Sequence, residues 1–195
     1  MLQRGEAAQE RGLGIRQVQV AVAARQWKAT AGEIRTAMLR LWDGSRFLAR
    51  NAETGEIGTS TLDLMPIAVG AGLPGQVSDT LAGRIAAHLT AHGPATEPTN
   101  SAQYASDGYW RGPIWAPSTV LIEDCLRRAG HVTLADEISQ RFRVLCEKSG
   151  FAENFDAETG TGLRDRAYTW TAASYLIFAA VRCRRAHALR RALVS

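Results

Sequence analysis

An internal repeat is the feature of this sequence that most restricts the folds open to it. A set of positions in the first third of the chain recurs at one constant offset: Glu33, Ile34, Leu41, Ser45 and Phe47 return as Glu137, Ile138, Leu145, Ser149 and Phe151. One position further along, the tetrapeptide 52–55 returns at 157–160. Repeated helical units bury their apolar faces by packing side by side into a solenoid or a closed ring. The repeat therefore predicts an all-α toroid with its insertions gathered at one end.

Hydrophobic periodicity assigns helices to most of the chain. The N-terminal residues 3–11 are weakly helical, and we expect a break at Gly12–Gly14 before the first long helix and a joint at Gly32 within it. Further helices are expected at 15–42, 60–70, 76–91, 117–129 and 132–148, and from 169 into an arginine-rich tail at 182–195. Short strands are expected at 45–50 and 150–155, followed by turns at 51–55 and 156–160.

The composition indicates one soluble globular domain. A chain of 195 residues with a hydrophobic fraction of 46% can bury a substantial core. Its net charge is +4, and its basic residues are scattered along the chain except in Arg182–Arg191, so we expect no nucleic-acid partner. The N-terminus has no apolar signal segment, and no apolar run could span a bilayer. We therefore expect a cytoplasmic protein without a membrane partner.

The cysteine and histidine residues do not predict a metal site. Cys125, Cys146 and Cys183 are widely spaced on expected helices, as for small buried hydrophobes in a reducing compartment. His88 and His92 could share a helix face, but a third ligand is missing nearby. We expect no metal and no other cofactor.

The stretch from Asp107 to Pro117 is the strongest candidate for a binding loop. It holds Tyr109, Trp110 and Trp115 among glycines and prolines that neither a helix nor a strand accommodates. Tyrosine and tryptophan in a concave site hold sugars, which have apolar faces and hydroxyl edges. The polar segment 92–108 leads into it, and loops of that length are often functional. The alternative is an ordinary interhelical loop whose tryptophans fill the core.

The repeat also singles out one carboxylate. The first sequence repeat has Ala49 between Phe47 and its turn, and the second sequence repeat has Glu153 at the matching place. A glutamate where the repeated scaffold requires none favours a functional role. The alternative is a surface glutamate on an edge strand.

Three blocks of this sequence resemble the signature blocks of glycoside hydrolase family 63. They are Tyr109–Trp115, then Gly150–Asp156 with Thr159–Gly160, and finally Tyr168–Ala173. A weaker block, Leu41–Asp43, is similar to an earlier family motif. The resemblance covers about residues 17–181 and is closest to the branch of bacterial mannosylglycerate and glucosylglycerate hydrolases.

The resemblance implies an (α/α)6 barrel, here about half of its ring, with short β-hairpin insertions. It also implies inverting hydrolysis of an α-glycosidic bond in a small carbohydrate, with Glu153 as the general base. The residues that match walls of the sugar subsite are Tyr109, Trp110, Gly112, Trp115 and Trp170. Arg111 belongs to the same motif, and Asp107 is placed to meet a sugar hydroxyl.

One departure from the family pattern limits the predicted activity. The block that carries the family's general acid, an aspartate in the first half of the barrel, is absent, and we interpret Asp43 as a dipole or capping residue instead. The chain then resembles the C-terminal half of the catalytic domain. We expect it to be inactive alone, with self-association or a complementing chain as the partnership that would complete it. The alternatives are a noncatalytic sugar-binding or interaction module, and a helical scaffold that uses Arg182–Arg191 to meet an acidic partner.

Overall fold

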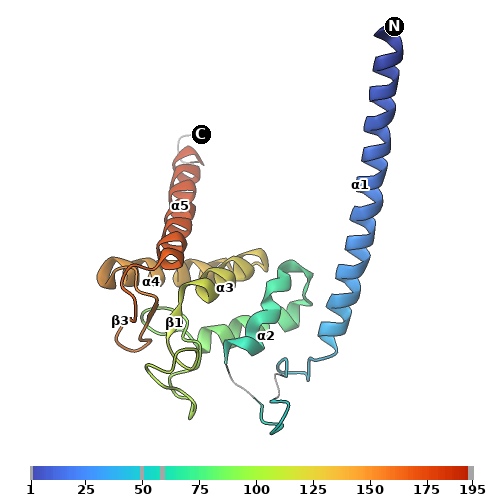
Figure 1. The fold of residues 1–195 in the computed structure, drawn as a ribbon. Coiled ribbons are helices and arrows are strands. Elements are labelled where there is room, and N and C mark those ends of the chain that lie inside the picture. The colour runs from blue at the N-terminus through green and yellow to red at the C-terminus, as the bar shows by residue number, and fades with distance from the viewer. Residues whose placement is uncertain (1, 49–50, 58–59, 193–195) are drawn as a thin grey trace. The chain divides into compact units, whose positions relative to one another are not determined.

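The computed structural model describes residues 2–48, 51–57 and 60–192, and within these ranges it describes side chains from residue 19 to residue 180. The chain forms two compact units that meet in sequence at Trp42 and Asp43. The first unit is dominated by helix α1, Leu2–Leu39, drawn in blue in Figure 1. Among the described helices, all fall short of the length and apolarity needed to cross a membrane.

Helix α1 corrects two sequence-based expectations. The predicted break at Gly12–Gly14 and the predicted joint at Gly32 are both wrong, because α1 continues from Leu2 through these glycines to Leu39. A glycine costs a helix only about 1 kcal/mol relative to alanine. At this cost the four glycines of α1, Gly5, Gly12, Gly14 and Gly32, do not interrupt a helix of 38 residues.

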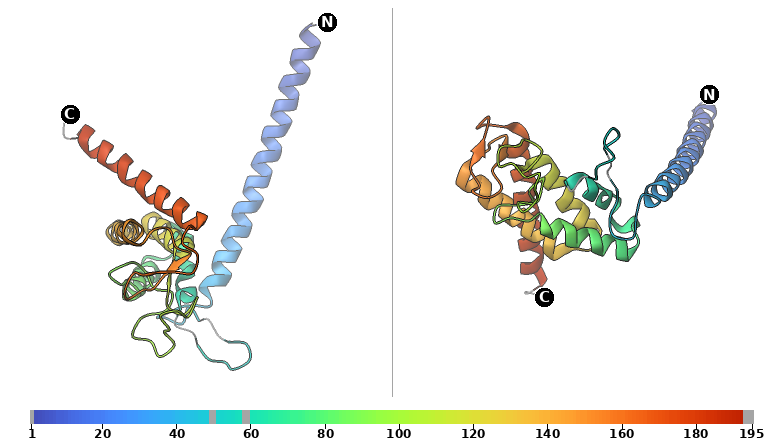
Figure 2. Two further views of the ribbon diagram at one scale, coloured as in Figure 1. Left: turned by 60° about the vertical axis from the view of Figure 1, so that its left-hand side comes forward. Right: turned by 90° about the horizontal axis from the view of Figure 1, so that it is seen from below.

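The second unit packs its helices around α3. Its helical segments are a 3-10 segment η1 (Thr61–Gly72), α2 (Gly75–Ala87), α3 (Ala116–Arg128), α4 (Val132–Ser149) and α5 (Thr169–Ala192). Helix α3 contacts η1, α4 and α5, and α4 also contacts α5 (Figure 2). These segments agree with the predicted helices, except that α2 ends early because Leu89 turns back to pair with Pro94.

Local signals explain where these helices begin and end. The Ser60 hydroxyl accepts a hydrogen bond from the backbone N–H of Leu62 and caps η1. Pro117 lies in the first turn of α3, where its missing N–H costs nothing. Helix α4 ends at Gly150, which adopts a φ of +75° that other residues avoid.

The main core joins α4, α5 and the short strands. The Phe142 ring of α4 makes edge contacts with Phe155 and Phe178, at centroid distances of 6.2 Å and 5.6 Å. Cys125 and Cys146 are buried, as predicted, and burial raises the pKa of the Cys146 thiol to about 12. Cys183 lies outside the residues whose side chains are described.

A small antiparallel sheet replaces the single strand predicted for 150–155. Its strands are β1 (Ile114–Trp115), β2 (Asn154–Phe155) and β3 (Gly162–Leu163), in that order. Before β2, Phe151 makes a parallel bridge with Ala167, so the chain changes its pairing between residues 151 and 154. Glu153 lies in the bend at this change, where its N–H donates to the carbonyl of Asp165 at 2.7 Å. Of the strand predicted for 45–50, a bridge residue at Phe47 is seen, and residues 49–50 lie outside the description.

The repeated turns have the same hydrogen-bond geometry. The Asn51 side chain accepts from the backbone N–H groups of Glu53 and Thr54, and the Asp156 side chain accepts from those of Glu158 and Thr159. The glycines that close the turns, Gly55 and Gly160, have φ angles of +72° and +71°. The predicted repeat is therefore confirmed at its turns.

The two turn glycines offer a matched pair of substitutions. An alanine at either position adopts a left-handed backbone at a cost of about 1–2 kcal/mol. A Cβ at Gly55 meets open space, whereas a Cβ at Gly160 would lie 2.9 Å from atoms of the His92 ring. We expect Gly160→Ala to lower the free energy of unfolding by at least about 1 kcal/mol more than Gly55→Ala does, because overpacking adds to the backbone strain. Urea unfolding followed by circular dichroism measures both, and equal losses would contradict the predicted close packing at Gly160.

Candidate active site

The loop that carries the aromatic residues contains glycines at positions where a side chain would not fit. Gly112 adopts a φ of +154°, and a Cβ there would collide with the carbonyl of Ala105 and the ring of Tyr104. The buried Thr96 hydroxyl accepts a hydrogen bond from the Gly112 N–H and donates one to the carbonyl of Pro113. These contacts fix the loop just before β1 and α3.

The three rings of this loop divide into a buried support and an exposed face. Trp115 is fully buried, and its indole N–H donates to the carbonyl of Tyr109 at 2.8 Å. Trp110 stacks on Trp115 with a centroid distance of 4.2 Å and an interplanar angle of 9°. Tyr109 and Trp110 are 44% and 47% exposed. Trp115 therefore fills the interior, as the alternative interpretation of the loop predicts, whereas the other two rings face solvent. We call Tyr109 and Trp110 the aromatic platform.

Glu153 lies against this platform. Its half-buried carboxylate accepts a hydrogen bond of 3.4 Å from the Tyr109 hydroxyl. Its backbone is held on both sides, because its N–H donates to Asp165 and its carbonyl accepts from the Trp170 indole at 3.2 Å. The buried hydroxyl of Thr171 donates to the preceding carbonyl, that of Ala152, at 2.6 Å. The carboxylate therefore contacts the aromatic platform, and the backbone of Glu153 is fixed by its neighbours.

A cluster around Arg164 connects the loop to the sheet. Arg164 forms an ion pair of 2.7 Å with Asp107, and its guanidinium donates to the side-chain oxygen of the fully buried Asn154 at 3.2 Å. The same guanidinium lies 4.8 Å from the centroid of the Tyr109 ring, within the range of a cation–π contact. Tyr109 and Arg164 are the two non-glycine residues with positive φ in the described part of the chain, both at 61°.

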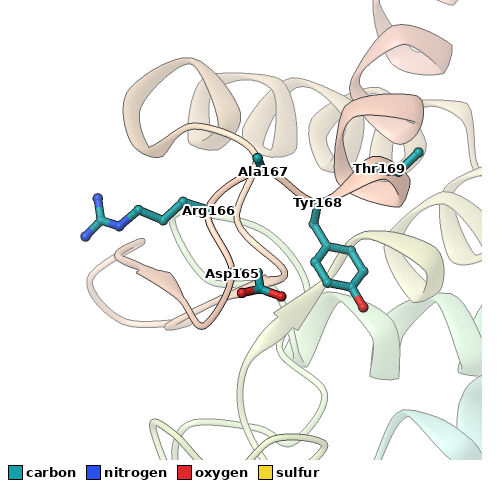
Figure 3. Close-up of a pocket in the computed structure, with 5 residues that line it drawn as sticks. All are labelled: Asp165, Arg166, Ala167, Tyr168 and Thr169. Atoms are coloured by element: carbon teal, nitrogen blue, oxygen red, sulfur yellow. The ribbon is translucent and has the colours of Figure 1, made fainter.

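A hollow lies where residues 165–169 cross from β3 to α5. It has a volume of about 390 Å³, and Figure 3 shows the side chains of Asp165 and Tyr168 extending to the same side while Arg166 points away. The Tyr168 ring packs on Trp170 at 4.5 Å. Desolvation raises the pKa of the Tyr168 hydroxyl, and the negative charges of Glu153 and Asp165 raise it further.

A second hollow, of about 330 Å³, is bordered by Trp110 of the platform. It is lined largely by apolar groups, including Trp110, Leu62, Met65 and Leu121. Successive contacts connect the two hollows, running from Trp110 to Tyr109, Glu153, Trp170 and Tyr168. The site is therefore an aromatic row with one carboxylate at its middle.

The structure brings most of the predicted site residues together and adds others. Tyr109, Trp110, Trp115, Trp170, Asp107 and Glu153 belong to one contact network. Gly112 is buried inside the loop, and the Arg111 side chain is exposed while its backbone closes the loop on Ala105 and Gly108. Sequence reasoning missed Arg164, Asn154 and Tyr168. Tyr168 opens the third signature block and could have been found, whereas nothing local marks Arg164.

Two further observations bear on the chemistry. The Asp43 carboxylate accepts hydrogen bonds from the N–H groups of Ser45 and Arg46, which agrees with a capping role, and these bonds lower its pKa. Among the residues whose side chains are described, His, Cys, Asp and Glu form no group of three that could hold a metal ion.

Comparison with known proteins identifies the family. The model of the mannosylglycerate hydrolase MGH1-like glycoside hydrolase domain matches residues 16–171. The chain belongs to this family. Its relatives include a mannosylglycerate hydrolase of Rubrobacter radiotolerans, 38% identical over 73 residues, which are 37% of this chain and 16% of that protein. A glucosylglycerate hydrolase of Mycolicibacterium hassiacum is 34% identical over 83 residues, which are 43% of this chain and 18% of that protein.

Solved structures confirm the predicted fold class. A family 63 mannosylglycerate hydrolase from Thermus thermophilus, in complex with Tris and D-glycerate, superposes with a TM-score of 0.66 at 23% identity. The match covers 74% of this chain and 36% of that structure. The neutral trehalase Nth1 of Saccharomyces cerevisiae matches with a TM-score of 0.60 at 18% identity, over 78% of this chain and 30% of its own. This mannosylglycerate hydrolase-like chain has the helical architecture of the (α/α)6 glycosidases and spans well under half of these relatives.

The division of the aromatic loop predicts unequal losses of stability from two tryptophan substitutions. Trp115→Phe leaves a cavity and removes the partner of the Tyr109 carbonyl, so we expect it to lower the free energy of unfolding by about 2 kcal/mol or more. Trp110→Phe changes a half-exposed ring, so we expect it to lower the free energy of unfolding by less than about 1 kcal/mol. Urea unfolding monitored by far-UV circular dichroism measures both losses. A larger loss for Trp110→Phe would reverse the assignment of support and platform.

Proposed function

We propose that this chain supplies the sugar platform and the general base of an inverting α-glycosidase site. The observation that carries the proposal is the contact between the Tyr109 hydroxyl and the Glu153 carboxylate, beside two half-exposed aromatic rings. A pyranose stacked on Trp110 would present its anomeric carbon near a carboxylate whose backbone is fixed by Asp165 and Trp170.

The chemistry of an inverting hydrolase follows from this arrangement. Glu153, as its carboxylate, takes a proton from a water molecule on one face of the sugar. The water oxygen bonds to the anomeric carbon as the bond to the aglycone oxygen breaks, so an α-glycoside yields the β-anomer. The donor Tyr109 occupies one lone pair of the carboxylate and directs the other oxygen toward the water. A second carboxyl group, about 6.5–9.5 Å from the first, must protonate the departing oxygen.

We propose that this general acid comes from outside the described residues. Asp43 is engaged in closing its own turn, and Asp107 forms the ion pair with Arg164. Several large apolar side chains on α3, α4 and α5 are also exposed: Leu121, Val144, Leu176 and Ile177. Apolar surface of this kind is usually covered by a partner surface. A complementing chain that covers these helices would supply the acid, and this chain alone would be inactive.

The proposed substrates are small α-glucosides or α-mannosides such as glycosylglycerates. The support comes from the family and from relatives named for mannosylglycerate and glucosylglycerate. A noncatalytic sugar-binding module is the second candidate, because the platform is complete within this chain while a paired acid is not seen among its described residues.

Sugar binding to the isolated chain tests the platform. We expect α-methyl glucoside or α-methyl mannoside to bind the native chain, and Trp110→Ala to weaken that binding about tenfold because the stacked ring is lost. Trp27→Ala, which removes an even more exposed tryptophan from the first unit, should leave the affinity unchanged. Calorimetric titration of the three proteins measures the dissociation constants. Equal weakening by both substitutions, or no binding by the native chain, would remove the proposed platform.

Turnover in a full-length relative tests the base. In a full-length mannosylglycerate hydrolase that has a glutamate at the position of Glu153, we expect replacement of that glutamate by glutamine to abolish turnover while sugar binding survives. The amide cannot accept the proton from water, but it preserves the shape of the site. Glycerate release and calorimetric binding measure the two properties. Unchanged turnover would exclude this glutamate from the mechanism.

A further inference from the structure

We propose that Arg164 is a positioning residue that holds Tyr109 against Glu153, and that the Asp107–Arg164 ion pair locks the aromatic platform onto the sheet. This inference rests on the proposed function for its consequence in sugar binding. Its structural part rests on contacts that exist without any sugar.

The guanidinium of Arg164 contacts three groups at once. One nitrogen of Arg164 bonds the Asp107 carboxylate at 2.7 Å, another bonds the Asn154 side-chain oxygen at 3.2 Å, and the planar group lies 4.8 Å from the Tyr109 ring centroid. Only a planar fork of donors can serve a carboxylate, an amide and an aromatic face together. A lysine at this position would keep the charge but lose this geometry.

The contact between Tyr109 and Arg164 joins two residues with an unusual backbone conformation. Tyr109 and Arg164 both have a φ of 61°, in the left-handed region that non-glycine residues rarely occupy. Such conformations cost about 1–3 kcal/mol and persist only where surrounding contacts enforce them. The strained residues touch each other, so the contact that links them is itself one of the constraints that keep each in place.

Asn154 depends on Arg164 for the hydrogen bond to its side-chain oxygen. Asn154 is fully buried, and its side-chain nitrogen has no hydrogen-bond partner among the described residues. Arg164 satisfies the other end of this amide. Asn154 precedes Phe155 in β2, pairs with Trp115 in β1 and follows Glu153 directly, so the arginine acts on the strand that carries the carboxylate.

Tyr109 connects Arg164 to the other groups of the site. Tyr109 bonds Glu153 through its hydroxyl, contacts Trp110 through its ring, and accepts the Trp115 indole N–H through its carbonyl. A residue that fixes Tyr109 therefore fixes the carboxylate and both indoles at once. Asp107, whose side chain is 69% exposed, holds the guanidinium from the solvent side.

The first arm of the test needs no sugar. The chain is labelled with 5-fluorotryptophan, and the fluorine resonances of its five tryptophans are assigned by single Trp→Phe substitutions. We expect Arg164→Gln to shift or broaden the Trp110 and Trp115 resonances and to leave those of Trp27 and Trp42 unchanged. Arg164→Lys should behave like Arg164→Gln. The control, Arg166→Gln, removes the neighbouring arginine that points away in Figure 3 and should change none of them.

The second arm measures the dissociation constant of the α-methyl glycoside. We expect Arg164→Gln to raise it by about 2- to 30-fold, the range of a cation–π contact. In a Tyr109→Ala background the same substitution should have no further effect, because Arg164 acts through Tyr109. Additive effects would show a merely structural role and overturn the inference.

The outcomes separate this inference from the proposed function. Should the native chain bind no sugar, the proposed function fails, and the fluorine spectra alone decide the role of Arg164. Unchanged Trp110 and Trp115 resonances in a folded Arg164→Gln protein would overturn the inference even if sugar binds. Where Arg164→Gln does not fold, Asp107→Asn at the exposed partner decides: a shift of the same two resonances supports the inference, and no shift overturns it.

Discussion

The pairing of Trp115 with Asn154 across β1 and β2 is the constraint on which the rest of the site depends. These strands are only two residues long, yet their antiparallel register sets the aromatic loop beside the segment that carries Glu153. Because Trp115 is also the N-cap residue of α3, the same pairing anchors the central helix of the second unit. A shift of this register by one residue would turn every side chain to the opposite face and separate the tyrosine from the carboxylate.

Burial and exposure are divided sharply among residues of one type. Trp115 is fully buried and makes the hydrogen bond that its indole N–H requires, whereas Trp110 lies flat upon it and keeps nearly half of its surface open. A ring that is to hold a ligand must be rigid without being covered, and stacking on a buried ring achieves both. The row continues through Tyr109, Glu153 and Trp170 to Tyr168, so the carboxylate lies among aromatic groups while its backbone is fixed by hydrogen bonds.

The repeat in the sequence has a clear local meaning and a different tertiary one. Asn51 and Asp156 close the same turn with the same backbone bonds, and the glycine that ends each turn has the same φ to within a degree. The helical positions do not share their environments: Ile138 and Leu145 are buried, while Ile34 and Leu41 are 65% and 58% exposed. Turn geometry depends on a few neighbouring residues and is readable from them. Burial depends on which other helices are present to cover a face, which no local pattern records.

The sequence by itself determined the helices of the second unit, the two matching turns and the rigid aromatic loop, because periodicity, glycine and proline act over a few residues. It also singled out Glu153, which matches Ala49 in the first sequence repeat. It also carried the signature blocks by which the family is recognised. It did not determine that α1 runs through Gly12, Gly14 and Gly32, that the second strand divides at Glu153, or that Trp115 is buried beneath Trp110. Nor did it indicate Arg164, whose partners Asp107 and Tyr109 come from a distant segment and whose partner Asn154 lies on the neighbouring strand. Only the folded chain brings these groups together, since a guanidinium chooses partners by their geometry in space and not by their separation in sequence.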